Sequence, residues 1–182
     1  MIRDDGRVLT QLDIPHAEPK MGKVAVIYTT PETVIDDYAR LLDLADYQTA
    51  LTPDIDTFLK VNISWQHYYP ACSSTPWQID GVVQKLQSDG FDKLTAAHNG
   101  TVVVNPVEGR EKNKHKVVED RLGLDHITLD VPPVTWIPYK PTAKMLVLDD
   151  VYKDGLYIPE VFPGTNIVQL PTVKTHVFTT MT

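Results

Sequence analysis

The sequence predicts an α/β fold, specifically a three-layer, Rossmann-like domain with helices on both faces of a mainly parallel sheet and a more β-rich C-terminal half. In the first half, short apolar runs alternate with predicted helices, two of which have a clear helix-start signal. Strands that alternate with helices are joined by right-handed crossovers, which makes the strands parallel. In the second half, prolines interrupt a series of short apolar runs and the alternation stops.

Composition restricts the kinds of partner. The 182 residues fit one α/β domain spanning 1–182. The composition, with 42% hydrophobic and 23% charged residues, is ordinary for a globular protein. A formal net charge of -7 argues against a nucleic-acid partner. No apolar run reaches the ~20 residues that span a bilayer. With no signal-peptide core at the N-terminus, we expect no membrane partner and a cytoplasmic location.

The N-terminal region contains the first predicted strand and helix. We expect residues 1–20 to form an extended arm or a short edge strand, and the apolar run Val24–Tyr28 to form a buried strand. Thr29-Thr30-Pro31-Glu32 is a helix-start signature. The helix that follows has one apolar face, made by Val34, Ile35, Tyr38, Leu41 and Leu42.

The stretch from Lys60 to Gly90 is the clearest strand-loop-helix unit. We expect a strand over Lys60–Ser64 and a helix that begins at Pro76. Thr75 is a good N-cap, and Gln78 stands at the position that a capping box requires. The helix carries a single apolar stripe, made by Ile79, Val82, Val83 and Leu86.

The rest of the chain is predicted more coarsely. Lys93–Ala97 reads as a strand, 101–113 as a loop in which Val102–Val104 is a possible short strand, and Lys114–Leu122 as a helix ended by Gly123. Four further strands are expected, at Ile127–Val131, Val134–Ile137, Lys144–Leu148 and Asn166–Leu170. Leu156–Phe162 is a candidate edge strand, because Pro159 argues against a central position in the sheet.

Polar residues follow several of these strands. Loops after parallel strands open on one edge of the sheet, which is where such folds bind ligands. The helix start at Thr75 also offers free N–H groups to a phosphate or carboxylate. Alternatively, Ser73, Ser74 and Thr75 only cap the helix. The candidate ligand-binding residues are Lys60, Asn62, Cys72, Ser73, Ser74, Thr75 and Asn99.

Lys174 and His176 are the candidate catalytic residues. One residue separates them, so in an extended segment both side chains point to the same side. They either contribute charge and proton transfer or mark a solvated strand end. Cys72 precedes a helix start, where a thiol is either activated or inert.

Sequence motifs name no reaction. The chain has no G-x-G-x-x-G, no P-loop and no H-E-x-x-H, so whether it is an enzyme stays open and its cofactor is unknown. Cys72 is the only cysteine, which excludes an internal disulfide and an iron–sulfur cluster held by this chain alone.

Three short motifs, in order, resemble the family called domain of unknown function 362. They are Lys60-x-Asn62, the Thr75-Pro76 helix start, and the ending Leu170-Pro-Thr-Val-Lys174-Thr-His176. The likeness runs from about Val24 to Thr182. The resemblance implies a microbial protein of unsettled role, often carrying an appended ferredoxin-like module and described as iron–sulfur for that reason.

The chain departs from that family pattern in two ways. It stops at Thr182, where the family continues with Gly and a Lys-Asn pair, and it has no cluster-binding cysteines. We therefore expect the N-terminal part of a longer protein, with no metal or iron–sulfur cluster in this part.

These expectations combine into two function hypotheses. The first is an enzyme-like, small-molecule-binding domain with an anionic ligand at the strand-carboxyl edge, coupled in a longer protein to an iron–sulfur module. The second is a non-catalytic binding or scaffold domain that positions a partner or that module. A bound anion favours the first, and an exposed apolar patch favours the second. The oligomeric state is not predicted.

Overall fold

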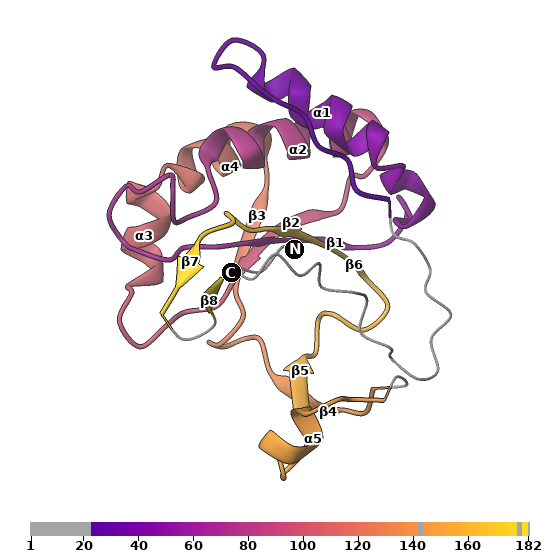
Figure 1. Cartoon of the computed structure of the whole chain (residues 1–182), viewed down its shortest axis with the longest axis vertical. Helices are drawn as coiled ribbons and strands as arrows, with labels where there is room; N and C mark the ends of the chain where they lie inside the picture. Colours follow the sequence, from indigo (N-terminus) through magenta and orange to yellow (C-terminus); the bar gives the residue numbers. More distant parts are fainter. Residues whose placement is uncertain (1–22, 142–143, 178–179, 182) are drawn as a thin grey trace, which may run out of the picture.

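The fold is organised around a four-stranded parallel sheet (Figure 1). The computed structural model describes residues 23–141, 144–177 and 180–181. The predicted α/β class with a parallel sheet is confirmed. In the order in which they lie side by side, the strands are β3 (Asp125–Thr128), β2 (Leu94–His98), β1 (Thr57–Val61) and β6 (Asn166–Leu170).

Four helices lie together on one face of this sheet (Figure 1). Helix α1 packs on α2, α2 on α4, and α4 on α3. A 3₁₀ turn, η1 (Tyr47–Thr49), follows α1. The helices are α1 (Val34–Leu44), α2 (Pro76–Ser88), α3 (Pro106–Lys112) and α4 (His115–Leu122).

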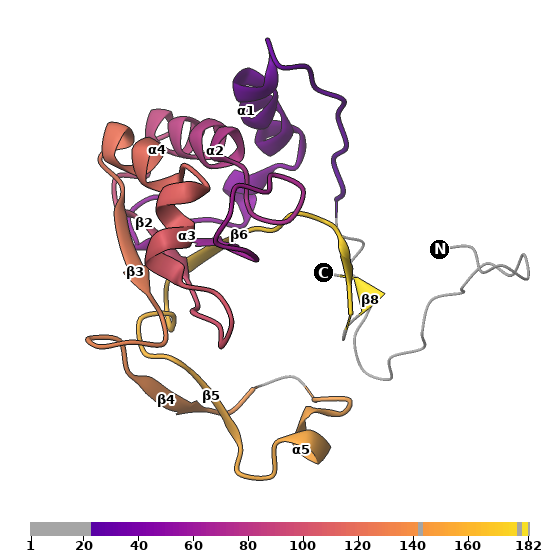
Figure 2. The ribbon, with the colours of Figure 1, turned by 90° about the vertical axis from the view of Figure 1, so that its left-hand side faces the viewer.

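The opposite face of the sheet is covered differently. The chain between β3 and β6 passes over it and carries an antiparallel pair, β4 (Trp136–Tyr139) with β5 (Leu156–Pro159), and the short helix α5 (Leu148–Val151). Figure 2 shows this excursion standing away from the helical layer. Within the described residues, the second helical layer of a three-layer fold is therefore not observed. A small hairpin, β7 (Thr175–His176) with β8 (Thr180–Met181), follows β6.

Each face of the sheet has its own core. Leu59 and Val61 of β1 point to the helices, and Phe58 points to the other face, as strand alternation requires. On that second face the ring of Phe58 meets Phe162 edge-on, with centroids 5.5 Å apart. The helical-side core is the larger, and its fully buried side chains include Ile79, Val83, Leu86 and Phe91.

Helix α2 begins as its sequence predicts. Thr75 has an extended backbone, its hydroxyl accepts the N–H of Gln78 at 3.3 Å, and Pro76 takes the first helical position. The reciprocal half of the capping box is absent, since the Gln78 amide reaches the carbonyl of Pro171 at 3.5 Å. Gly81 allows close packing on α1, because a Cβ there would lie 2.8 Å from the carbonyl oxygen of Ile35.

The order of the strands defines a switch point. From β1 the chain passes through α2 to β2 and then through α3 and α4 to β3, always moving in one direction across the sheet. It then returns to place β6 on the other side of β1. Ligands of open α/β sheets bind outside the carboxyl ends of the strands, where the strand order reverses. In this sheet that position lies between β1 and β6.

The strand predicted at Val24–Tyr28 is not formed in the structure. Residues 23–30 are extended but belong to no strand of the structure, and the side chains of Val24 and Tyr28 are 83% and 97% exposed. Strand propensity needs a neighbouring strand to hydrogen-bond with, and no described strand lies beside this segment. The arm expected at 1–20 lies outside the described residues.

Two other early predictions need correction. The strand expected at Lys60–Ser64 is β1, which begins at Thr57 and ends at Val61, because side-chain hydroxyls take over the backbone N–H groups of Asn62 and Ser64. The stretch 101–113 was expected to be a loop, and it contains α3. Asn105 caps α3 by accepting the N–H of Glu108 at 3.1 Å. The possible short strand at Val102–Val104 is not formed, and the structure has only a single antiparallel bridge between Thr101 and Val104.

The later strands are found with shifted bounds, with one exception. The strand expected at Lys144–Leu148 is wrong, since Leu148 begins α5 and the described residues before it form no strand. Leu146 and Val147 are more than 60% exposed there, so the apolar run has no core to face. By contrast, Asn166–Leu170 matches β6 residue for residue, and the helix that Gly123 was expected to end is α4. No helix within the described residues is long and apolar enough to cross a bilayer.

Candidate functional site

A cavity of about 580 Å³ opens at the switch point between β1 and β6. Its walls come from the carboxyl ends of β1 and β6, the loop after β2, and the segment after β6. The lining residues are Lys60, Val61, Asn62, Ile63, Ser64, Thr101, Val103, Val104, Gln169, Pro171, Lys174 and His176. The cavity thus lies where ligands bind in open α/β sheets.

Lys60 lies in this wall as a half-buried cation. It stands on β1 directly beside Gln169 of β6, on the sheet face away from the helices. Its ammonium group donates to the carbonyl oxygen of Val61 at 3.3 Å, and no carboxylate pairs with it among the described residues. Burial lowers the pKa of Lys60, because removal from water disfavours the charged amine. An anion entering the cavity would offset that cost.

Asn62 shapes the rim of the cavity. Its amide nitrogen donates to the hydroxyl of Ser64 at 2.8 Å and to the carbonyl oxygen of Cys72 at 3.0 Å. These two bonds fold the loop after β1 back on itself. Asn62 is therefore held in place by its own loop at the edge of the cavity.

The loop before α2 ties the two walls together. The Ser74 hydroxyl accepts the N–H of Asn62 at 2.8 Å and donates to the carbonyl oxygen of Leu170. Thr172 adds a second link, because its hydroxyl donates to the carbonyl oxygen of Ser73 at 2.8 Å. Ser73 and Ser74 are almost fully buried. The end of β1 and the end of β6 are thereby fixed relative to each other.

Lys174 and His176 come from the segment after β6, and both line the same cavity as Lys60. His176 lies in β7. None of the described residues that line the cavity is acidic, although the chain has 24 Asp and Glu residues and a net charge of -7. The wall therefore collects positive charge in a protein that is acidic as a whole.

The structure divides the candidates predicted from sequence into two groups. Four of them, Lys60, Asn62, Lys174 and His176, meet at the cavity. The others are not part of its lining. The Thr75 hydroxyl caps α2, and those of Ser73 and Ser74 bond to backbone groups, which leaves them in structural roles. Cys72, a free and half-buried cysteine, and Asn99 also lie outside the lining.

Sequence reasoning missed Gln169 and Thr101, which also line the cavity. Gln169 has a detectable signal, since it is a polar residue near the end of an otherwise apolar run. Thr101 has none, because its place in the wall depends on how the loop after β2 folds back in the isolated bridge to Val104.

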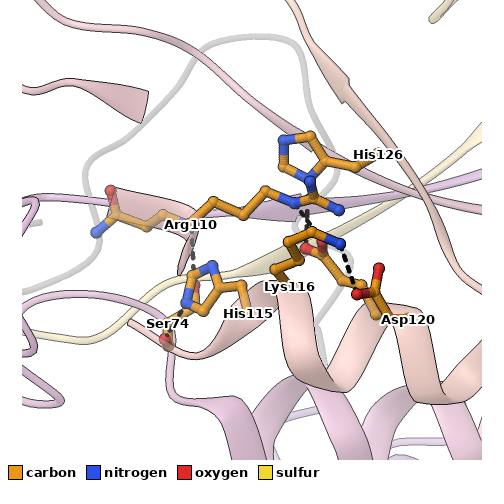
Figure 3. A network of polar contacts seen from close by, with 8 residues as sticks. Ser74, Arg110, His115, Lys116, Asp120 and His126 are labelled. Carbon is orange, nitrogen blue, oxygen red and sulfur yellow. Dashed lines mark hydrogen bonds and ion pairs between the residues drawn. The ribbon is translucent and has the colours of Figure 1, made fainter. Parts of the chain in front are cut away.

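A second polar cluster lies between the sheet and helices α3 and α4 (Figure 3). The Glu119 carboxylate is fully buried and pairs with Arg110 at 2.5 Å, and the ring of His126 approaches it at 3.3 Å. Burial raises the pKa of Glu119, but hydrogen bonds and charge from His126 and Arg110 outweigh it and hold that pKa below its usual range. This carboxylate ties α3 and α4 to β3.

Two buried histidines adjoin this cluster. His115 donates from Nε2 to the carbonyl oxygen of Ser74 at 2.7 Å, which fixes its neutral tautomer. Burial and the nearby ring of His126 lower the pKa of His98 to about 4. Within the described residues, the Nδ1 atoms of both rings lack a hydrogen-bond partner. No group of three or more potential metal ligands is assembled in the part of the chain that the structure describes.

Comparison with known proteins adds no further information. No family model matches the chain, and neither the curated proteins nor the solved structures contain a match. The resemblance drawn from the Lys60-x-Asn62, Thr75-Pro76 and Lys174-x-His176 motifs therefore stays a prediction.

Proposed function

We propose that this chain is an enzyme-like, small-molecule-binding domain whose ligand carries a phosphate or carboxylate group. The ligand binds in the cavity between the ends of β1 and β6. One observation carries the proposal: two lysines and a histidine line this cavity, and no described acidic residue does.

Charge and position together support an anionic ligand. A half-buried lysine without a carboxylate partner is costly, and a bound anion removes that cost. Lys60 and Lys174 lie on two different walls, so an anion between them is contacted from both sides. The carboxyl edge at a switch point is the usual ligand position of such sheets.

The roles of individual residues follow from this arrangement. Lys60 and Lys174 supply positive charge, and Asn62 and Gln169 supply amide groups that orient the ligand. His176 is the candidate for proton transfer, because an imidazole ring carries one nitrogen that can donate a proton and one that can accept it. In a longer protein this domain would be coupled to an iron–sulfur module, as the family resemblance implies.

A second function is favoured by the excursion that carries β4 and β5. Its aromatic side chains are strongly exposed: Trp136 is 44%, Tyr139 46%, Tyr152 54% and Tyr157 51% exposed. Exposed aromatic groups of this kind are typical of surfaces that bind another protein. We therefore keep a scaffold domain as the second candidate, with this excursion as its contact surface.

The test is a binding titration with defined anions. Inorganic phosphate and a small dicarboxylate are titrated into the protein at constant ionic strength, and heat and melting temperature are recorded. A ligand present at ten times its Kd stabilises the folded state by about 1.4 kcal/mol. Saturable stabilisation by either anion, but not by chloride, supports the proposal.

A variant links that binding to the cavity. Lys60→Met keeps the length of the side chain and removes the charge, so it should abolish the anion effect without lowering the melting temperature. The control is Lys153→Met on the exposed part of the excursion, where the lysine side chain is 72% exposed. If neither anion stabilises the wild-type protein, or if Lys60→Met binds as well as wild type, the proposal fails and the scaffold hypothesis gains.

A further inference from the structure

Residues 23–30 form an extended segment with the composition of a strand and no strand partner. The side chains of Val24, Val26 and Tyr28 are 83%, 77% and 97% exposed. Among the described residues, no backbone hydrogen bond involves 24–28. Alternating β-branched and aromatic residues pack best on a pleated sheet. This apolar segment thus lacks the surroundings that its sequence favours.

The segment lies outside the sheet, along α1 (Figures 1 and 2). Lys23 forms an ion pair with Asp46, and Ile27 shares a small pocket with Val34 and Tyr38 of α1. These contacts involve one face of the segment only. The opposite face, with Val24, Val26 and Tyr28, is exposed.

The sheet has an open edge at β6. Among the described strands β6 pairs only with β1, so one side of its backbone has no strand neighbour. Ile167 on this strand is 39% exposed. An unpaired sheet edge is a template for another strand.

The handedness of the fold assigns this edge to the segment. The crossovers from β1 to β2 and from β2 to β3 use helices on one face and move in one direction across the sheet. Helix α1 lies on that same face, packed on α2. A right-handed crossover through α1 into β1 must therefore start on the side of β1 away from β2. Since β6 occupies the adjacent position, the open position is the outer edge of β6.

We propose that Lys23–Tyr28 adds to the outer edge of β6 as a parallel fifth strand of the same chain. Only Thr29–Thr33 separates the segment from α1, so its effective concentration at its own sheet is in the millimolar range. This tether favours the chain's own segment over that of a second copy. In the proposed register Ala25 pairs with Asn166. Ile27 then lies beside Val168 on the face toward the helices, and Val26 lies beside Ile167 on the opposite face.

Docking would also change the candidate ligand site. Thr29 and Thr30 directly follow the segment, at the carboxyl end of the new strand. They would then lie beside Pro171, which lines the cavity. This consequence rests on the proposed function, whereas the docking itself does not. The new strand would add hydroxyl groups to one wall of the anion site.

Hydrogen exchange on the wild-type chain tests the docking directly. Strand pairing should protect amides within 24–28, making their exchange at least tenfold slower than that of Val102 and Val103. Those two valines are an internal reference, because they are 105% and 73% exposed and lie in a turn. If 24–28 exchanges as fast as the reference, the segment is not paired and the proposal is wrong.

Cross-linking locates the partner strand. In a Cys72→Ser background, Val26→Cys is combined with Ile167→Cys on β6, and both thiols are bridged with dibromobimane. The matched control combines Val26→Cys with Asp125→Cys on β3, the opposite edge of the sheet. We expect a link within single chains for the β6 pair only. A yield equal to the control, or links only between two chains, would overturn the proposal. Neither measurement uses a ligand, so failure here is distinguishable from failure of the anion site.

Discussion

Lys60 and Gln169 stand opposite each other on β1 and β6, and both line the cavity at the switch point. In parallel pairing, cross-strand neighbours share a face of the sheet. A substitution at Gln169 alone can therefore place a charged group beside the Lys60 amine.

The first prediction uses this neighbour. Gln169→Glu keeps the shape of the side chain and adds a carboxylate beside Lys60. The new ion pair should raise the pKa of Lys60 relative to wild type and weaken binding of phosphate or a dicarboxylate by roughly tenfold. Calorimetric titration measures the change. Gln84→Glu, on the exposed surface of α2, is the control and should bind as wild type does. Equal affinity in both variants would contradict the assigned role of Lys60.

The second prediction concerns Lys174. Lys174→Ala should weaken anion binding by roughly tenfold or more, the worth of one charge-assisted contact. The melting temperature is measured on the same samples, because a loss of affinity that exceeds any loss of stability identifies a ligand contact. Lys153→Ala removes an equal charge far along the excursion and should leave binding unchanged. If Lys174→Ala destabilises the protein without affecting affinity, the residue is structural.

The third prediction concerns the link between the two cavity walls. Ser74→Ala removes one hydroxyl that serves both the N–H of Asn62 and the carbonyl of Leu170. Two backbone groups near the core then lose a partner, so the free energy of unfolding should fall by about 2 to 4 kcal/mol. Urea unfolding measures it. Ser88→Ala, at the exposed end of α2, is the control, with an expected change below about 0.5 kcal/mol. Equal losses in the two variants would refute the structural role of Ser74.

The fourth prediction is a loss of stability in mild acid. The pKa of His98 in the folded state is about 4, below the ordinary value of 6.5. Below pH 6.5 the unfolded chain binds a proton that the folded chain does not, so stability is full above pH 6.5 and falls as the pH approaches 4. The loss from His98 is of the order of 3 kcal/mol at the lower end.

Unfolding measurements at several pH values between 8 and 4.5 would show this fall. The carboxyl group of Asp89, whose pKa is lowered to about 2 by Tyr47 and Lys85, responds only below pH 4. His98→Phe should reduce the pH dependence, whereas His67→Phe at an exposed position should retain it. An unchanged slope in His98→Phe would show that another group causes the fall.

The fifth prediction concerns the buried pair of Arg110 and Glu119. Arg110→Met removes the guanidinium partner of a fully buried carboxylate and leaves it only the ring of His126, so it should cost about 3 kcal/mol. Adding Glu119→Gln removes the uncompensated charge and should restore part of that loss. Urea unfolding of both single variants and the double variant gives the coupling energy. Additive losses would show that the two side chains do not interact.

Several features were determined by local sequence. Thr75-Pro76 specifies where α2 begins, because the cap and the fixed proline φ act within one turn of helix. Gly123 ends α4 for a similar reason, since it adopts a left-handed conformation with φ of 65°. The run Asn166–Leu170 identifies β6 because it is a short apolar run, and Val168 and Leu170 on one face of it pack into the helical-side core.

Other features depended on contacts between distant parts of the chain. Val24–Tyr28 has the sequence of a strand, yet only the presence of a neighbouring strand can make it one. The covering of the second sheet face by the excursion, in place of helices, likewise depends on the contact between Phe58 and Phe162.

The candidate site shows the same division. The sequence by itself determined that Lys60, Asn62, Lys174 and His176 lie at or after the ends of apolar runs, because such runs are visible in the local sequence. It also determined that Lys174 and His176 share one side of an extended segment. Only the tertiary structure decided that these residues meet at one cavity, that Gln169 joins them, and that Ser73 and Ser74 are buried in backbone contacts. The physical reason is that strand order is set by packing across the whole sheet, and pairing β6 with β1 brings two distant segments together.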